Sequence, residues 1–258
     1  MIKNKICVLI PALNEARNIG PVIKEIKELH LPLHIIVLDD GSTDTTAQVA
    51  TQNGCKVLRT FRNIGLCNTV ARGLKYAAQK RYSFMVQLDA DYQHNPRTIP
   101  ALLNKLHEGA DYVVASRYIK KHSPSTSLIR RLGTQCISIG MRLATGTKIY
   151  DPTSGYKAMN RKTFMYLSRT YPKHFPEPEI LLSLIQRKFT IIEVPSQMRH
   201  RLFGSSTISL PKAFYLMGFI ASNIFMYGIK RFFSTVFASH QSLKVLCVHL
   251  IVWNRNTI

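Results

Sequence analysis

Short apolar segments alternate with longer amphipathic segments along the first 117 residues. The apolar segments, rich in Val, Ile and Leu, predict strands at residues 5–10, 33–38, 55–60, 83–88 and 111–116, with another at 190–195. Between them, apolar positions recur near a 3.6-residue period, which predicts helices at residues 16–29, 45–52, 69–80 and 97–108. This alternation is typical of an α/β protein whose mainly parallel, twisted sheet is covered by helices on both faces.

The pattern changes beyond about residue 118. A basic, Ser-rich stretch leads into a helical pattern over residues 128–143, in which Arg130, Arg131 and Arg142 interrupt the apolar residues. One side of this helix carries the apolar positions Leu128, Leu132, Cys136, Ile139 and Leu143.

The last part of the chain contains two further apolar stretches. Between Lys212 and Lys230 lie 17 uncharged residues, several of them aromatic, and a shorter apolar run covers residues 244–253. Seventeen residues is the lower limit for a helix that spans a bilayer, and aromatic residues flanked by lysine favour an amphipathic helix lying in the membrane interface. A helix packed on the domain and a transmembrane span are the alternatives. We therefore predict one α/β domain at residues 1–210 and a membrane-associating helical extension at 211–258.

The 258-residue chain is strongly basic, and the excess is concentrated in its second part. It carries 35 Lys and Arg against 14 Asp and Glu, a net charge of +21, and residues 116–258 hold 21 of the basic and 4 of the acidic side chains. A basic half suits nucleic acid, an anionic membrane face or a phosphorylated substrate. It lacks aromatic residues interleaved with Lys and Arg in a binding motif, so no nucleic-acid partner is expected.

Several other classes are disfavoured by what the sequence does not contain. The five cysteines are scattered and never spaced as CxxC, which indicates reduced thiols in a cytoplasmic compartment and no zinc site. No GxGxxG follows the first predicted strand and no GxxxxGK[ST] occurs, which argues against a dinucleotide-binding Rossmann enzyme and a P-loop NTPase. Nothing in the sequence specifies an oligomeric state.

Polar motifs follow the predicted strands at the points where those strands end. PALNEA follows the first strand, DDGSTD the second and DADYQH the fourth. Ligands of open α/β sheets bind at the carboxyl ends of the strands, so these motifs are expected to meet at one edge of the sheet. Asp39 and Asp40 could accept hydrogen bonds from a base N–H or a ribose hydroxyl, and Asp44 suits a helix N-cap.

The motif DADYQH places Asp89 and Asp91 one residue apart. The two carboxylates can share one target only if the chain turns at Ala90, because alternate residues of a strand point to opposite faces. Two hard oxygen donors, with the Gln93 amide oxygen as a third, then suit Mg²⁺ or Mn²⁺ bound to substrate phosphates. The alternative is a solvated polar turn, and the acidic clusters at the neighbouring strand ends favour the metal site.

Ten short motifs follow one another along the chain: PALNE, DDGSTDTT, NIG, LDADYQHNP, ASRY, RRLG, DPTSGY, EPE, EVP and RLFGSS. In this order, over about residues 5–210, they resemble the inverting glycosyltransferases of family 2, which have the GT-A fold. More narrowly, the series is similar to the branch that contains dolichyl-phosphate mannose synthase and the bacterial polyprenyl-phosphate glycosyltransferases.

The resemblance implies a role for each motif that contacts the donor. The residues expected to hold the nucleoside part of a nucleotide sugar are Pro11, Ala12, Asn14, Glu15, Asp39 and Asp40. The residues expected to hold a divalent metal on the diphosphate are Asp89, Asp91 and Gln93. The RxxGxS loop expected to cover the nucleotide contributes Arg201, Gly204 and Ser206.

The resemblance also implies a catalytic group. Arg117 and Arg131 match arginines that meet phosphates, either the leaving diphosphate or a lipid phosphate. Asp151 and Glu179 match further positions of this branch. We take four residues as catalytic, namely Asp91, Arg117, Arg131 and Asp151, and Glu179 as a substrate-binding residue.

These observations predict a glycosyltransferase that uses a nucleotide sugar and Mg²⁺ or Mn²⁺, with inversion, at the cytoplasmic face of a membrane. Its acceptor is predicted to be a polyprenyl-phosphate-like lipid. One alternative is transfer to a saccharide hydroxyl in envelope polysaccharide synthesis, which needs a carboxylate base such as Asp151 or Glu179. An alternative from another class is a basic nucleic-acid-binding protein.

Overall fold

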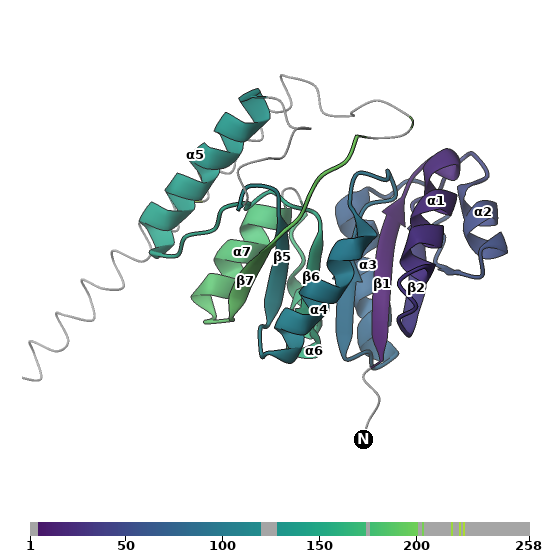
Figure 1. The fold of residues 1–258 in the computed structure, drawn as a ribbon, viewed down its shortest axis with the longest axis horizontal. Coiled ribbons are helices and arrows are strands. Elements are labelled where there is room, and N and C mark those ends of the chain that lie inside the picture. The colour runs from purple at the N-terminus through teal and green to yellow at the C-terminus, as the bar shows by residue number, and fades with distance from the viewer. Residues whose placement is uncertain are drawn as a thin grey trace, which may run out of the picture.

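The structure is a computed structural model that describes residues 5–119, 128–173 and 176–200, together with Phe203, Gly218, Ser222 and Ile224. Within these residues, seven strands form one sheet in the order β3-β2-β1-β4-β6-β5-β7 (Figure 1). Apart from those single residues, the predicted extension at 211–258 lies outside the described part of the chain.

All strands except β6 coincide with apolar segments of the sequence. They are β1 (Ile6–Ala12), β2 (Leu33–Asp39), β3 (Lys56–Val57), β4 (Phe84–Gln87), β5 (Tyr112–Ser116), β6 (Lys157–Asn160) and β7 (Ile191–Pro195). All neighbouring strands pair in parallel except β6, which runs antiparallel to both β4 and β5. The predicted, mainly parallel sheet is therefore confirmed.

Helices cover both faces of this sheet (Figure 1). They are α1 (Ala16–Lys27), α2 (Thr46–Gln52), α3 (Leu66–Gln79), the 3₁₀ turn η1 (Pro96–Thr98), α4 (Ile99–His107), α5 (Leu128–Thr145), α6 (Arg161–Thr170) and α7 (Pro176–Gln186). Helices α1, α2 and α4 share one buried cluster with the sheet, and α3, α5, α6 and α7 share a second cluster on the other face. A sheet sandwiched in this way fixes the ends of its strands rigidly.

Strand β6 and helices α6 and α7 have no counterpart in the elements predicted from the sequence. Strand β6 spans only four residues and starts with Lys157, so it lacks the apolar signature of a buried strand. The starts of α6 and α7 do carry readable signals. The Asn160 side chain accepts a hydrogen bond from the Thr163 amide at 3.0 Å, and α7 begins with Pro176 followed by Glu177 and Glu179.

Candidate active site

The carboxyl ends of β1, β2 and β4 meet at one edge of the sheet, as the positions of the polar motifs predicted. Ala12 pairs with Asp39 at the ends of β1 and β2, and Asp89 follows the end of β4. Because β6 runs in the opposite direction, its first residue, Lys157, pairs with the last residue of β4. The segment 151–156, which enters β6, therefore joins the same edge.

The turn after β1 is fastened to the loop after β2. The Asn14 amide donates to Ser42 Oγ at 3.0 Å, and the Thr43 amide donates to Asn14 Oδ1 at 2.9 Å. The Glu15 amide donates to Thr46 Oγ1 at 2.9 Å. Asn14 and Glu15 thus shape this side of the edge, and their direct contact with a nucleoside stays a prediction.

Asp39 is fully buried at the end of β2, beside the buried Pro11 and Ala12 of β1. Its Oδ1 accepts a hydrogen bond from the Ser42 amide at 2.9 Å. Its Oδ2 lies 3.1 Å from Arg59 Nε, yet it accepts no hydrogen bond from the described residues. A buried oxygen that accepts no hydrogen bond lowers the stability of the fold, so Asp39 Oδ2 is suited to accept one from an N–H or O–H group of a bound nucleoside.

Asp40 uses both of its carboxylate oxygens within the protein. Oδ1 accepts from the Ile64 amide at 2.9 Å, and Oδ2 accepts from the Gly65 amide at 3.0 Å. Gly65 immediately precedes α3, so Asp40 positions the start of that helix. Its assignment to nucleoside binding stays a prediction, and the structure adds this local role.

Gly41, in the DDGST motif, cannot carry a side chain without distortion. Its φ is +75°, and a β-carbon there would lie 2.5 Å from the Arg62 carbonyl carbon. We expect Gly41→Ala to lower the free energy of unfolding by more than about 2 kcal/mol, because left-handed strain adds to a backbone clash. The matched control is Gly109→Ala, where φ is +102° but no atom lies within 4 Å. Equal losses in urea unfolding would contradict the clash.

The chain turns sharply after β4, as a shared target for Asp89 and Asp91 requires. Tyr92 has a φ of +68°, and the Gln93 amide donates to Asp91 Oδ1 at 3.0 Å. The Asp89 amide donates to His94 Nδ1 at 3.0 Å. The turn is therefore held by hydrogen bonds on both sides of Asp91.

His94 belongs to the motif LDADYQHNP, but no role in the site was predicted for it. Its ring is buried and stacks on Tyr156, with the ring centroids 5.0 Å apart. Because Nδ1 accepts the hydrogen bond from the Asp89 amide, the ring proton resides on Nε2. His94 thus orients the backbone of Asp89.

The surroundings of Asp89 favour a bound cation. Its side chain is 41% exposed, and a β-carbon at Gly155 would stand 3.4 Å from Oδ2, so the segment entering β6 leaves room beside the carboxylate. Partial burial raises the pKa of Asp89, and the carboxylate of Asp91 adds to this shift, while Glu177 raises the pKa and Lys157 lowers it. The repulsion between these carboxylates would be relieved by a divalent cation.

The donor set fits a metal that also binds substrate. Among the described residues, no three His, Cys, Asp or Glu side chains form a protein-only metal cluster. Mg²⁺ and Mn²⁺ in proteins retain water ligands and also bind phosphate oxygens. The carboxylates of Asp89 and Asp91, with the side-chain amide oxygen of Gln93, would therefore suffice as the protein ligands.

Arg117, directly after β5, forms a two-pronged ion pair with Asp151. Nε donates to Asp151 Oδ2 and Nη2 to Oδ1, both at 2.7 Å, and Nη2 also donates to Thr153 Oγ1 at 2.7 Å. The Arg117 amide adds a further hydrogen bond to Oδ2 at 3.0 Å. Burial lowers the pKa of Arg117, but the hydrogen bonds and charge of Asp151 outweigh it and raise the pKa. Asp151 is itself fully buried.

Glu193 of β7, in the EVP motif, accepts hydrogen bonds from the backbone beside this pair. The Tyr150 amide donates to Glu193 Oε2 at 2.7 Å, and the Asp151 amide donates to Oε1 at 2.8 Å. The motif was visible in the sequence, but no role followed from it, because its partners lie in another segment.

Arg131 and Glu179 lie on helices that flank the edge. Arg131 is exposed in the first turns of α5, one turn before Thr134, whose hydroxyl lies 3.3 Å from that of Thr153. Glu179 is half-buried in the first turn of α7. The remaining predicted residues, Arg201, Gly204 and Ser206, lie outside the described residues.

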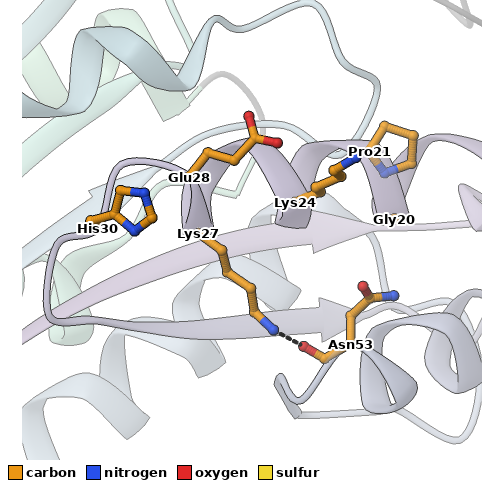
Figure 2. Close-up of a pocket in the computed structure, with 7 residues that line it drawn as sticks. All are labelled: Gly20, Pro21, Lys24, Lys27, Glu28, His30 and Asn53. Carbon is orange, nitrogen blue, oxygen red and sulfur yellow. Dashed lines mark hydrogen bonds between the residues drawn. The ribbon is translucent and has the colours of Figure 1, made fainter.

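A surface pocket lies elsewhere, between α1 and the end of α2 (Figure 2). Lys27 crosses it and donates from Nζ to the Asn53 carbonyl oxygen at 2.6 Å. Its described lining residues are Gly20, Pro21, Lys24, Lys27, Glu28, His30 and Asn53. None of these belongs to the polar edge of the sheet, so the pocket is separate from the candidate active site.

A comparison with family models decides the family. Residues 7–167 match the model described as glycosyl transferase family 2, which covers more than half of the chain. The chain belongs to glycosyl transferase family 2. It is therefore an enzyme that transfers sugars, with the GT-A fold and the branch that the sequence motifs indicated.

Curated relatives of this family 2 enzyme point to its branch. It is 28% identical to polyprenol monophosphomannose synthase of Mycolicibacterium smegmatis, over 78% of this chain and 80% of that protein. It is 32% identical to dolichol-phosphate mannosyltransferase of Pyrococcus furiosus, over 79% of this chain and 59% of the relative. It is 30% identical to undecaprenyl-phosphate 4-deoxy-4-formamido-L-arabinose transferase of Serratia proteamaculans, over 83% of this chain and 65% of the relative. The chain thus spans less than two thirds of the last two proteins.

Solved structures support the fold of this family 2 enzyme. Glucosyl-3-phosphoglycerate synthase from Mycobacterium tuberculosis, crystallised with Mn²⁺, uridine diphosphate and phosphoglyceric acid, superposes with a TM-score of 0.63. The two share 22% identity over 88% of this chain and 78% of that chain. At this level of identity the likeness concerns the fold.

Proposed function

We propose that this family 2 enzyme transfers a sugar from a nucleoside-diphosphate sugar to the phosphate of a polyprenyl-type lipid, with a divalent metal and inversion at the sugar. The relatives named above act on polyprenyl, dolichyl or undecaprenyl phosphates by their names, and the synthase structure was crystallised with Mn²⁺ and uridine diphosphate. Asp39 would hold the nucleoside, and Asp89 and Asp91 the metal and diphosphate.

The observation that carries the choice of acceptor is the Arg117–Asp151 pair. Transfer to a saccharide hydroxyl needs a base to remove its proton. Asp151 accepts two guanidinium hydrogen bonds and one from an amide, so its oxygens are occupied. A lipid phosphate is already an anion at neutral pH and needs no base. This arrangement supports a phosphate acceptor over a hydroxyl acceptor with Asp151 as the base, and a hydroxyl acceptor would then depend on Glu179, the other predicted base.

The reaction can be written for these groups. A phosphate oxygen of the lipid attacks C1 of the sugar from the side opposite the leaving group, and the bond between C1 and the β-phosphate oxygen breaks. The nucleoside diphosphate leaves with the electron pair. A bound divalent cation would stabilise the charge that builds on the β-phosphate. Arg131, exposed on α5, would meet the lipid phosphate. Arg117 fixes the loop that contains Asp151 and Thr153 and would add positive charge beside the diphosphate.

Two measurements test this function. Calorimetric titration with UDP-, GDP- and dTDP-sugars, with and without Mn²⁺, is expected to show one metal-dependent donor. Incubation of that donor, sugar-labelled, with polyprenyl phosphate is expected to yield a lipid product that releases its label in mild acid. Label that resists mild acid would favour a hydroxyl acceptor. DNA or RNA binding without donor affinity would support the nucleic-acid alternative instead.

Helix α5 supports a further part of the proposal, docking at a membrane surface. Its buried side is formed by residues such as Ile137 and Met141, whereas Leu132, Ile139 and Leu143 are 61%, 59% and 82% exposed. These three residues, which we call the outer face of α5, are accompanied by exposed arginines at 131 and 142. Apolar residues with flanking cations suit an anionic lipid interface.

We expect Leu132→Glu together with Leu143→Glu to weaken binding to vesicles containing phosphatidylglycerol at least tenfold, because both added charges oppose burial of the outer face in lipid. Co-sedimentation measures this. The control is Leu31→Glu, a 37% exposed leucine that precedes β2. Unchanged binding of the double variant would show that α5 does not touch lipid.

The cytoplasmic face and interfacial anchoring by residues 211–258 stay predictions. Among the described residues, no helix has both the length and the apolar character that crossing a bilayer requires.

A further inference from the structure

A lysine occupies a buried position in the middle of the sheet. Lys157, the first residue of β6, is fully buried and pairs with Gln87 of β4 on one side and Val114 of β5 on the other. Its side chain points to the face of the sheet covered by α3, α6 and α7, because Met159, two residues on, belongs to that cluster. An unpaired ammonium group there would cost several kcal/mol.

The partner of this lysine is a carboxylate that reaches solvent. Lys157 Nζ lies 3.3 Å from Glu177 Oε1, and the Glu177 side chain is 21% exposed. Glu177 stands in the first turn of α7, where the helix dipole also favours a carboxylate. Lys157 therefore holds the Glu177 carboxylate in a fixed position, where it can accept further hydrogen bonds.

The pair carries no net charge. Burial lowers the pKa of Lys157, but Tyr112, Tyr171 and Glu177 raise it well above its ordinary value, so the ammonium form persists. Burial raises the pKa of Tyr112 to about 12, which keeps that phenol neutral. Glu177 is therefore balanced by Lys157 and adds little to the negative charge at Asp89.

The strand register places the pair next to the candidate metal carboxylates. Lys157 is opposite Gln87, and Asp89 follows Gln87 by two residues, about 7 Å along the chain. Gly155, two residues before Lys157, faces Asp89 directly, since a β-carbon there would lie 3.4 Å from Asp89 Oδ2. Glu177 and Lys157 both act electrostatically on Asp89. A group attached to a diphosphate at Asp89 would lie within reach of Glu177.

We propose that Glu177, held in place by Lys157, accepts hydrogen bonds from hydroxyl groups of the donor's sugar and so selects which sugar is transferred. Glu177 is then a specificity-determining residue and Lys157 a positioning residue. This inference rests on the proposed function, because it assumes a nucleotide sugar at Asp89 and Asp91. A neutral hydroxyl suits a charge-balanced carboxylate, whereas a metal ion suits the uncompensated pair of Asp89 and Asp91.

The test separates the sugar from the rest of the donor. Affinities would be measured by calorimetry with Mn²⁺ for three probes: the nucleotide sugar that wild type prefers among the UDP-, GDP- and dTDP-sugars, its epimer at one hydroxyl, and the matching nucleoside diphosphate. In Glu177→Gln we expect preferred-donor affinity to fall about 10- to 100-fold, as for loss of a hydrogen bond to a charged group. Discrimination against the epimer falls with it, while nucleoside-diphosphate affinity stays within about twofold.

A double variant keeps the test valid if Glu177→Gln fails to fold. Lys157→Met with Glu177→Leu removes both charges together, which avoids a lone buried ion, and should show the same loss of epimer discrimination. The matched control is the exposed ion pair at the end of α4, Lys105 Nζ and Glu108 Oε2, which lie 2.6 Å apart. It is removed as Lys105→Met with Glu108→Gln. It should leave all three affinities unchanged.

Two results are decisive against the inference. A folded variant with wild-type donor affinity and wild-type epimer discrimination would overturn it. A loss that is equal for the nucleotide sugar and the nucleoside diphosphate would also overturn it, by assigning Glu177 to the metal or diphosphate. Failure of the proposed function looks different, because wild-type protein itself would then bind none of the nucleotide sugars.

Discussion

Asp91→Asn is expected to abolish sugar transfer, with at least a 1000-fold loss, while the protein stays folded. Asparagine keeps an oxygen to accept from the Gln93 amide, the bond now made by Asp91 Oδ1 at 3.0 Å. It removes the charge that a divalent metal requires, and loss of one electrostatic element at a reacting phosphate costs about 100- to 1000-fold alone. Weaker retention of the metal adds to this loss.

The measurement for Asp91→Asn is donor turnover with Mn²⁺ varied over a wide range, accompanied by thermal unfolding. The control, Glu108→Gln, removes an exposed carboxylate that directly follows α4 and should leave turnover unchanged. Turnover of Asp91→Asn at the wild-type rate would exclude Asp91 as a metal ligand. A fall in unfolding temperature that accounts for the lost activity would show that Asp91 serves the turn only.

The second large effect concerns stability and activity together. Arg117→Met is expected to lower the free energy of unfolding by about 3–5 kcal/mol, because it leaves the fully buried Asp151 as an uncompensated charge. Adding Asp151→Leu removes that charge and should restore most of the stability. Transfer should nevertheless remain reduced about 100-fold or more, since the loop near the diphosphate has lost its arginine.

A double-mutant cycle in urea measures the coupling between Arg117 and Asp151. Lys105→Met serves as the control, because its partner Glu108 is exposed and such pairs contribute less than about 1 kcal/mol. If the double variant recovered wild-type transfer, Arg117 would have no role beyond holding the loop. If single and double variants were equally unstable, the pair would not be the source of the stability.

The periodic parts of the fold were predictable from the sequence. Residues 33–38 and 83–88 alternate with helical segments as parallel strands must, and the carboxylates that follow them, Asp39 and Asp89, mark one edge of the sheet. Strand β6 was not predictable, because Lys157 breaks the apolar pattern and is tolerated only through Glu177, 20 residues away.

Side chains that accept hydrogen bonds from backbone amides of the site were also missed. Glu193 holds the amides of Tyr150 and Asp151, which lie 43 and 42 residues earlier, and His94 acts on the amide of Asp89. Periodicity reports which face of an element is apolar and not what covers that face. For this reason the apolar stripe of α5 was visible in the sequence, but its outward orientation was not.

The antiparallel direction of β6 has a consequence for how this enzyme can diversify. A parallel strand offers the active edge only the residues that follow it, and the chain must then return through a helix of sufficient length. A reversed strand offers the residues that precede it, so the whole segment from Arg117 to Lys157 begins and ends at that edge. Insertions in this segment leave the register of the seven described strands unchanged. This edge of the site can therefore change through substitutions or insertions in one continuous stretch of chain.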